Sequence, residues 1–272
     1  MSGRLSPFRE CVESAGELTS FTMIEEYARR LDQALLARRE IPPLTASHGD
    51  FDLETAYRIQ EQGVALRLER GEKIVGYKMG LTSAAKRAQM NLGSPIYGVL
   101  TGAMRVSGTL RAAEGIHPKI EPEIAFITAR ELRGNISRDE ALKACSGVAP
   151  AMDVLDSRFV GFKFSLPDVV ADNCSSWRFV LGEPKKPRDV GGLRVRMSVD
   201  GVLKQEADSN AISGHPLESL VQLVAMLHAH GRPLPAGSIV LAGAATAAEP
   251  LRPGMRVDLE VEHLGALSLA AT

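Results

Sequence analysis

The amino-acid sequence predicts an α+β protein in which a helical N-terminal part packs on a β-rich C-terminal part. Apolar residues recur at helical spacing over much of residues 23–93, whereas from about Val106 short β-prone runs are separated by Gly, Pro and Asp. The connections between the later strands are too short for regular β-α-β crossovers throughout. We therefore expect an extension over residues 1–22, a helical part over residues 23–105 and a β-rich part over residues 106–272.

The helical part is defined by capping residues and by apolar spacing. Apolar residues from Ile24 to Leu35 follow the capping-box pattern Thr22–Glu25 at helical spacing, so the first helix is expected to begin there. Residues 1–22 are polar and aperiodic, which predicts a flexible tail. The predicted elements are a helix from Thr22 to the Pro42-Pro43 pair, a helix from the N-cap Asp52 to Gly71, a strand over Lys73–Met79 and a helix from Ser83 to Gly93.

The β-rich part is a series of short strands with two helices between them. Asp200-Gly201 between two β-prone runs is a strong signal for a two-residue hairpin turn. The pattern Ser137–Glu140 is a capping box, and His215-Pro216 begins an amphipathic helix that ends at Gly231. The predicted strands are Lys119–Ile127, Ala149–Leu155, Trp177–Leu181, Arg194–Val199, Val202–Lys204, Ser238–Leu241, Met255–Glu262 and Leu267–Ala270.

Composition and charge exclude several classes of protein. Lys and Arg number 32 against 33 Asp and Glu, which gives a net charge of -1 and no basic footprint for nucleic acid or a membrane. No apolar run is long enough to span a bilayer, and residues 1–22 lack the apolar core of a secretory signal. Three distant cysteines, Cys11, Cys145 and Cys174, argue against a disulfide framework, so we expect a reduced, cytoplasmic compartment.

The stretch Lys119–Ile127 carries two acids within an apolar strand. Side chains alternate between the faces of a strand, so Glu121 and Glu123 point the same way while the other face is apolar. Carboxylates held this close are costly unless a cation joins them, and oxygen ligands without His or Cys nearby suit Mg²⁺ or Mn²⁺. The alternative is a solvated edge strand with two surface glutamates, which Pro122 fits.

A further acid, Asp153, lies among apolar residues of the next predicted strand. Glu121, Glu123 and Asp153 would then give three oxygen ligands on neighbouring strands, with water and substrate filling the open positions of an octahedral site. Alternatively, Asp153 is a strand acid that Arg158 or backbone donors satisfy. Near the end of this strand, Asp156 and Arg158 can pair with each other.

Three other segments can contribute to a site. Lys78 lies between two glycines at the end of a strand, where a lysine can act as an acid, a base or a charge clamp, or simply be solvated. The polar cluster Asp172–Ser176 can bind a carboxylate or form a plain turn, and Cys174 within it is more consistent with a small packed residue than with a catalyst. The small-residue loop Gly243–Ala248 either lets the backbone approach a ligand or is a tight connection.

Several short motifs follow one another in a specific order, although each is weak alone. They are Gly76–Ser83, Pro95–Gly98, His117–Ala125, Asp156–Arg158, Ala171–Asn173, Gly214–Pro216 and Leu241–Gly243. With this ordered set, the chain from Met23 to its C-terminus resembles the 2-keto-4-pentenoate hydratase and 4-oxalocrotonate decarboxylase family. That family is similar to the C-terminal domain of fumarylacetoacetate hydrolase, which implies a β-rich domain of mixed sheets rolled as in that enzyme.

The resemblance also implies a site with a divalent metal, Mg²⁺ or Mn²⁺, and a lysine. The implied metal ligands are Glu121, Glu123 and Asp153, the last standing where the family typically has Glu. The implied catalytic residue is Lys78, which matches the active-site lysine of the family. The implied substrate-binding residues are Leu92 and Ser175, and we expect the loop near Thr246 to help position the substrate carboxylates.

The activity that the resemblance implies depends on finer features, since the stretches Asp172–Ser176 and Leu241–Ala248 look more like those of the decarboxylases and one further position differs from the hydratases. Hydratases of this kind tend to carry Asp just before the aromatic residue of the Pro-x-(Phe/Tyr)-Gly motif, where this chain has Ile96, and isoleucine cannot handle the proton of a water molecule. We therefore expect a decarboxylase that converts 4-oxalocrotonate (2-oxo-3-hexenedioate) to 2-hydroxypenta-2,4-dienoate in the meta-cleavage breakdown of aromatic compounds. The alternatives are a 2-keto-4-pentenoate hydratase and an inactive homologue that scaffolds a partner enzyme. A homo-oligomer and a complex with the partner hydratase are also expected.

Overall fold

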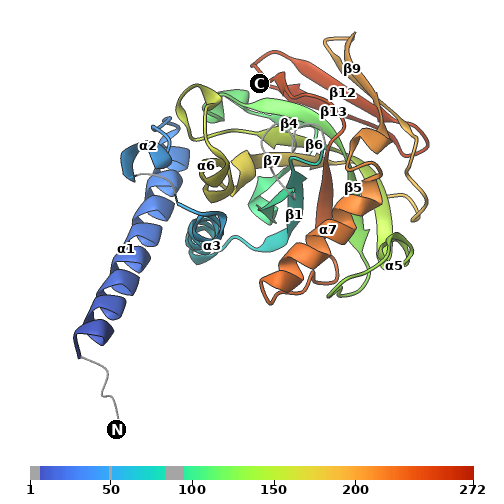
Figure 1. The fold of residues 1–272 in the computed structure, drawn as a ribbon. Coiled ribbons are helices and arrows are strands. Elements are labelled where there is room, and N and C mark those ends of the chain that lie inside the picture. The colour runs from blue at the N-terminus through green and yellow to red at the C-terminus, as the bar shows by residue number, and fades with distance from the viewer. Residues whose placement is uncertain (1–6, 49–50, 84–94) are drawn as a thin grey trace.

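The computed structural model describes residues 7–48, 51–83 and 95–272 of the chain. Two β-sheets lie against each other, and helices flank the larger one (Figure 1). The predicted α+β class is therefore confirmed. Within the described residues, no helix combines the length and the apolar character needed to cross a bilayer.

The larger sheet has eight strands in the order β2-β1-β10-β5-β6-β7-β3, with β11 paired to β5. Two neighbouring pairs, β1 with β10 and β3 with β7, are parallel, and the other pairs are antiparallel. The strands of this sheet are β1 (Ile74–Gly80), β2 (Ile96–Thr101), β3 (Arg105–Val106), β5 (Lys119–Thr128), β6 (Cys145–Leu155), β7 (Ser176–Leu181), β10 (Ile239–Ala244) and β11 (Glu249–Pro250).

The smaller sheet has five strands in the order β4-β13-β12-β8-β9. Buried Val257, Leu259 and Val261 alternate with more exposed neighbours along β12, so one face of this sheet packs inward and the other faces solvent. Strands β12 and β13 lie against β6 of the larger sheet. The strands of the smaller sheet are β4 (Thr109–Leu110), β8 (Arg194–Val199), β9 (Val202–Asp208), β12 (Arg256–Val261) and β13 (Gly265–Ala271).

The helices form two groups on the larger sheet (Figure 1). Helix α1 packs on α3, α3 packs on α6, and α6 lies against the edge strand β2, whereas α7 contacts both β10 and α5. The α-helices are α1 (Pro7–Ala37), α2 (Thr45–His48), α3 (Leu53–Glu69), α5 (Arg138–Lys143), α6 (Leu166–Ala171) and α7 (Pro216–Ala229). Short single turns are η1 (Gly102–Met104), η2 (Ala112–Glu114), η3 (Val160–Phe162), η4 (Asn173–Ser175) and η5 (Ser209–Ala211).

Several local predictions are confirmed in detail. The Asp52 carboxylate accepts a hydrogen bond of 2.8 Å from the backbone N–H of Thr55 and caps α3. Ser137 and Glu140 form the predicted capping box of α5. The turn between β8 and β9 has positive φ at both Asp200 (51°) and Gly201 (77°), the combination that a type I′ hairpin turn requires.

Two boundaries differ from the prediction. Helix α1 begins at Pro7 rather than at Thr22, because proline suits a first helical position and several residues after it, including Arg9, Glu10 and Leu18, are good helix formers. The expected boundary between residues 105 and 106 cuts through the larger sheet, since β1 pairs in parallel with β10, which follows it by more than half the chain. The predicted helix from Ser83 to Gly93 lies almost entirely outside the described residues.

Candidate metal centre and active-site cavity

Three carboxylates converge at the middle of the larger sheet. Glu121 of β5 and Asp153 of β6 lie directly opposite each other in the antiparallel ladder, and Glu123 lies two residues further along the same face of β5. One carboxylate oxygen from each residue lies within 4.8 Å of the others. The shared face that strand alternation predicted for Glu121 and Glu123 therefore exists, and the β5–β6 register adds Asp153 to it.

The surroundings of these carboxylates fit a cation. Glu123 and Asp153 are fully buried. Burial raises the pKa of Glu123 well above its ordinary value, and the nearby Asp153 and Glu121 carboxylates raise it further. Glu123 Oε1 and Asp153 Oδ1 have no hydrogen-bond partner among the described residues. A hard divalent cation would satisfy such buried oxygens, which repel one another and lack hydrogen-bond donors.

Lys78 of β1 lies beside the acidic cluster and is almost fully buried. Its Nζ forms an ion pair with Asp153 Oδ2 and donates a hydrogen bond of 3.2 Å to the carbonyl oxygen of Cys174. Burial alone would lower the pKa of Lys78, but the Asp153, Glu121 and Glu123 carboxylates outweigh it, so the pKa is raised. Lys78 is therefore an ammonium at neutral pH, and it is Lys78, not Arg158, that pairs with Asp153.

A bulge in β10 directs a backbone donor into the cluster. The pairing of β10 with β5 shifts register between Leu241 and Ala244, and Gly243 within the bulge has φ of 106°. Its N–H donates a hydrogen bond of 2.7 Å to Glu123 Oε2. A Cβ at this position would overlap the side chain of Thr82. The small residue in this loop therefore has a specific role, since its N–H orients the Glu123 carboxylate within the acidic cluster.

The polar cluster after α6 forms a left-handed turn. Asn173, Cys174 and Ser175 have φ of 49°, 52° and 55°, a conformation that costs non-glycine residues about 1 to 2 kcal/mol each. The Asn173 side chain holds the turn through two hydrogen bonds to Val99 of β2. The turn aims the Cys174 carbonyl at Lys78 and leaves Ser175 Oγ buried without a partner in the described part of the chain.

Glu121, Lys78 and Ser175 all line one cavity of about 310 Å³, which lies at the ends of β1, β5 and the η4 turn. One wall is apolar and includes Ile96, Phe162 and other side chains. The full lining is Lys78, Met79, Gly80, Leu81, Thr82, Ser83, Ile96, Lys119, Glu121, Leu155, Phe162, Phe164, Val169, Cys174, Ser175, Ala244, Ala247 and Ala248. A volume of this size is at the lower end of the range for small-molecule sites.

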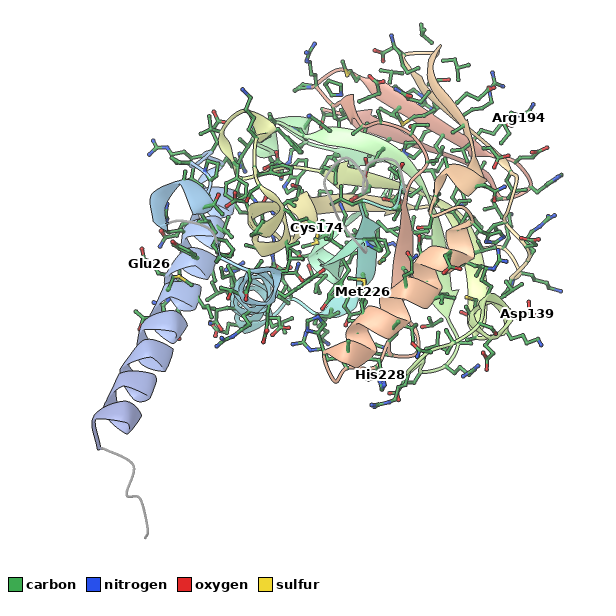
Figure 2. The ribbon with its side chains drawn as sticks, in the orientation of Figure 1. Glu26, Asp139, Cys174, Arg194, Met226 and His228 are labelled. Atoms are coloured by element: carbon green, nitrogen blue, oxygen red, sulfur yellow. The ribbon has the colours of Figure 1, made fainter. Side chains whose placement is uncertain are left out.

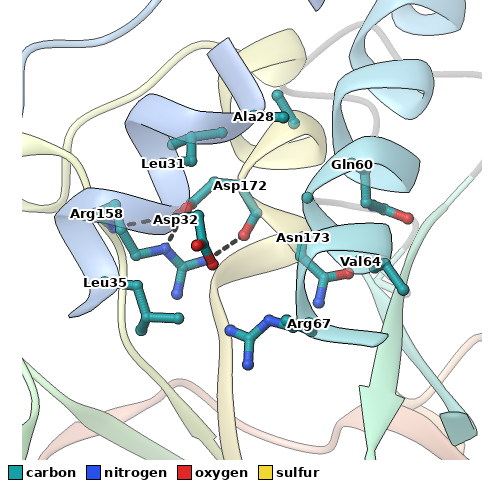
Figure 3. Close-up of a pocket in the computed structure, with 12 residues that line it drawn as sticks. Ala28, Leu31, Asp32, Leu35, Gln60, Val64, Arg67, Arg158, Asp172 and Asn173 are labelled. Carbon is teal, nitrogen blue, oxygen red and sulfur yellow. Dashed lines mark hydrogen bonds and ion pairs between the residues drawn. The ribbon is translucent and has the colours of Figure 1, made fainter. Parts of the chain in front are cut away.

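A second, smaller pocket lies between α1 and α3 and has a structural role (Figure 3). Its volume of about 30 Å³ holds little more than a water molecule. Within it the Arg158 guanidinium pairs with the Asp172 carboxylate and donates to the carbonyl oxygen of Asp156. The expected pairing between the Asp156 carboxylate and Arg158 is therefore wrong, because that carboxylate accepts hydrogen bonds of 2.8 Å from the N–H groups of Ile116 and His117.

Cys174 lies in the interior of the molecule (Figure 2), and its side chain is buried. Burial raises the pKa of its thiol to about 12, so the reactive thiolate is absent at neutral pH. Its contribution to the site is the backbone carbonyl that Lys78 contacts. This agrees with the expectation of a small packed residue.

The remaining predicted site residues have different outcomes. Thr246 does not line the cavity, and its hydroxyl donates to the carbonyl oxygen of the neighbouring Ala247. Leu92 lies outside the described residues. Two cavity residues that the sequence analysis missed are Lys119 and Phe162. Lys119 could have been found from strand alternation, since it lies two residues before Glu121.

Comparison with known proteins gives concordant results. Residues 75–270 match the fumarylacetoacetate (FAA) hydrolase C-terminal family. A 4-oxalocrotonate decarboxylase of Pseudomonas sp is 46% identical over 252 residues, covering 92% of this chain and 98% of that protein. A 2-hydroxyhexa-2,4-dienoate hydratase of Comamonas testosteroni is 34% identical over 257 residues, covering 92% and 97%. The solved structure of 4-oxalocrotonate decarboxylase from Pseudomonas putida G7, complexed with magnesium and adipate, has a TM-score of 0.89 at 35% identity and covers 92% of this chain and 97% of that one.

Proposed function

The chain belongs to the fumarylacetoacetate hydrolase C-terminal family, and we propose that it is a lyase that decarboxylates 4-oxalocrotonate to 2-hydroxypenta-2,4-dienoate. This reaction belongs to the meta-cleavage breakdown of aromatic compounds. The observation that carries the proposal is the convergence of Glu121, Glu123 and Asp153 beside Lys78 at a cavity of about 310 Å³. The high identity to decarboxylases over nearly the whole chain supports it.

The acidic cluster would hold a divalent cation, and its all-oxygen donor set favours Mg²⁺ or Mn²⁺. A cation bound there would act as a Lewis acid that polarises the 2-oxo group of the substrate. Gly243 fixes the Glu123 carboxylate through its backbone N–H, and the Glu121 carboxylate reaches the cavity. Asp153 is shorter than the usual Glu but is already within reach of both glutamates.

The bond changes in the substrate can be written in full. The C5–C6 bond breaks and CO₂ leaves, while its electron pair forms the C4–C5 double bond. The electrons of the C3–C4 double bond move to C2–C3, and those of the ketone move onto its oxygen, so a dienolate results. Protonation of that oxygen gives 2-hydroxypenta-2,4-dienoate. Lys78, an ammonium at the edge of the cavity, supplies a positive charge and a proton to this oxygen.

Ile96 favours decarboxylation over hydration. The alternative function is a 2-keto-4-pentenoate hydratase, which the 34% identity to a dienoate hydratase keeps open. Ile96 lines the cavity and is buried, so no carboxylate is available at this point of the wall to activate water. The apolar wall also suits the release of CO₂, which is uncharged.

The test compares two substrates with the same purified protein. We expect Mg²⁺-dependent release of CO₂ from 4-oxalocrotonate, complete loss of turnover in chelator and recovery when Mg²⁺ or Mn²⁺ is added back. Water addition to 2-hydroxypenta-2,4-dienoate without CO₂ release would establish the hydratase instead. Full turnover in chelator would refute the role of the metal.

Glu123→Ala tests whether the Glu123 carboxylate is needed for activity rather than for folding. The variant should lose turnover but stay folded, because relief of the repulsion between buried carboxylates offsets the cost of leaving the Gly243 N–H unpaired. Added Mg²⁺ should raise the melting temperature of the native protein but not that of the variant, since only the native site binds the ion. Glu131→Ala, at an exposed position, is the control. Unchanged turnover in Glu123→Ala would reject the assignment.

The scaffold alternative and the expected assemblies are tested by binding. An inactive homologue would bind no Mg²⁺ at millimolar concentration, which calorimetry measures directly. Association with a hydratase would pass the dienol product from one enzyme to the next, and co-purification of the two proteins tests it. Light scattering gives the number of copies in the expected homo-oligomer.

A further inference from the structure

Lys119 begins β5 on the face that carries the metal-binding glutamates. Side chains two residues apart in a strand share a face, so Lys119, Glu121 and Glu123 form a row along the larger sheet. Two residues span about 6.6 Å of strand. Lys119 and Glu121 both line the cavity of about 310 Å³. Lys119 therefore lies on the cavity wall, two strand residues beyond Glu121 and away from Glu123.

The ammonium of Lys119 is held in place without a carboxylate partner. Its Nζ lies 4.0 Å from the centroid of the Phe162 ring, a cation–π contact. Among the described residues, no carboxylate lies within ion-pair distance of Lys119. The other lysine of the cavity, Lys78, is committed to Asp153. Lys119 thus offers a positive charge without a carboxylate partner to a ligand that binds in the cavity.

The aromatic partner of Lys119 is set in a strained backbone. Gly161 and Phe162 have φ of 62° and 60°, and a bulky non-glycine residue rarely adopts this conformation. The Gly161 N–H donates a hydrogen bond of 2.9 Å to the Glu40 carboxylate, and the His117 ring lies 5.1 Å from that of Phe162. These contacts hold the Phe162 ring under the Lys119 ammonium at the cavity wall.

We propose that Lys119 binds the carboxylate at the far end of a dicarboxylate substrate, and this inference rests on the proposed function for the class of substrate. Three carboxylates and the Lys78 ammonium leave the inner end of the site with a net charge that one divalent cation cancels. The 2-oxo acid end of a dianion would lie there. Five carbon–carbon bonds of about 1.5 Å carry the second carboxylate about 6 Å further, which matches the spacing from Glu121 to Lys119.

Lys119 is expected to act on binding more than on turnover. An ion pair to the outer carboxylate stabilises the bound substrate, but that carboxylate loses its charge as CO₂ forms. The interaction is therefore weaker in the transition state than in the bound substrate. Lys119→Met should raise KM for 4-oxalocrotonate about ten-fold or more, with kcat unchanged or higher.

The decisive experiment measures binding rather than turnover. Calorimetry in Mg²⁺ compares 2-oxoadipate with 2-oxohexanoate, which has the same chain and 2-oxo acid but lacks the second carboxylate. The native protein should prefer 2-oxoadipate by about ten-fold to a hundred-fold, the range for a hydrogen bond between charged groups. Lys119→Met should remove the preference by weakening 2-oxoadipate alone, and Lys119→Arg should keep most of it. Lys163→Met, an exposed lysine near the same turn, should keep all of it.

Each result decides the assignment of Lys119. Equal weakening of both acids in Lys119→Met, a retained preference in that variant, or no preference in the native protein would overturn it. The binding result is independent of catalysis. If the protein shows the lysine-dependent preference but releases no CO₂, the role of Lys119 is supported and the proposed decarboxylation is refuted. A native protein that binds neither acid would refute both.

Discussion

Asn173→Ala tests how the left-handed turn beside the cavity is held. Strand β2 is an edge of the larger sheet, so within the described ranges the outward N–H and C=O of Val99 have no neighbouring strand. Asn173 Oδ1 accepts a hydrogen bond of 2.7 Å from the Val99 N–H, and its Nδ2 donates one of 2.9 Å to the Val99 carbonyl. The side-chain amide thus replaces the missing strand at this point.

The expected cost follows from these two buried bonds. Truncation leaves one buried donor and one buried acceptor of Val99 unsatisfied, each at about 1 to 3 kcal/mol. Alanine also tolerates the φ of 49° at position 173 less well than asparagine does. We expect the free energy of unfolding to fall by about 3 kcal/mol or more. Because the turn positions the Cys174 carbonyl and Ser175 Oγ, kcat/KM for 4-oxalocrotonate should fall at least about ten-fold.

Urea unfolding and steady-state CO₂ release measure the two effects. Asn135→Ala, at an exposed position, should change the free energy of unfolding by less than about 0.5 kcal/mol and leave kcat/KM unchanged. If Asn173→Ala matched this control in stability and in kcat/KM, the two bonds to Val99 would not be what holds the turn.

Two further predictions concern the backbone and the thiols. Gly243→Ala should lower the free energy of unfolding by about 2 kcal/mol or more, because alanine is strained at φ of 106°. It should also weaken Mg²⁺ binding, measured by calorimetry, because Glu123 loses a well-placed donor. A native-like stability and a native-like affinity for Mg²⁺ would contradict this prediction. Burial raises the pKa of Cys145 to about 11 and of Cys174 to about 12, so both thiols stay protonated below those values. A Cys11→Ser variant should therefore resist a thiol reagent at pH 8 when folded and react at both remaining cysteines in urea, whereas rapid labelling of the folded protein would refute the burial argument.

The parts of the site that depend on local geometry could be predicted from the sequence. The period of two in a strand places Glu121 and Glu123 on one face, and no tertiary information is needed for this. Placing Asp153 beside these glutamates required only the assumption that two consecutive predicted strands pair, and consecutive strands commonly do so. The resemblance implies the same three acids, so the strand pattern and the resemblance give the same candidate ligand set.

The parts that depend on long-range pairing could not be predicted. Lys78 meets Asp153 because β1 joins the sheet in parallel with β10, and no local pattern encodes that pairing. Arg158 pairs with Asp172 rather than with its sequence neighbour because the distant N–H groups of Ile116 and His117 occupy the Asp156 carboxylate. The left-handed conformation of Ser175 contradicts its propensity, and it is held by the Asp156 N–H, which donates to the Ser175 carbonyl oxygen, and by the bonds of neighbouring Asn173 to Val99.

The two ends of the cavity are built differently, and this bears on how related chains can differ in activity. The acidic end is set by the register of β5 on β6, where a shift by one residue would turn Glu121 and Glu123 to the opposite face. The wall that meets the rest of the substrate comes largely from turns, including Phe162 of η3 and Ser175 of η4. Turns tolerate substitution without disturbing the sheet. Selection for a different 2-oxo acid can therefore act on the turns and on single wall positions such as Ile96, while the proposed metal ligands stay in place.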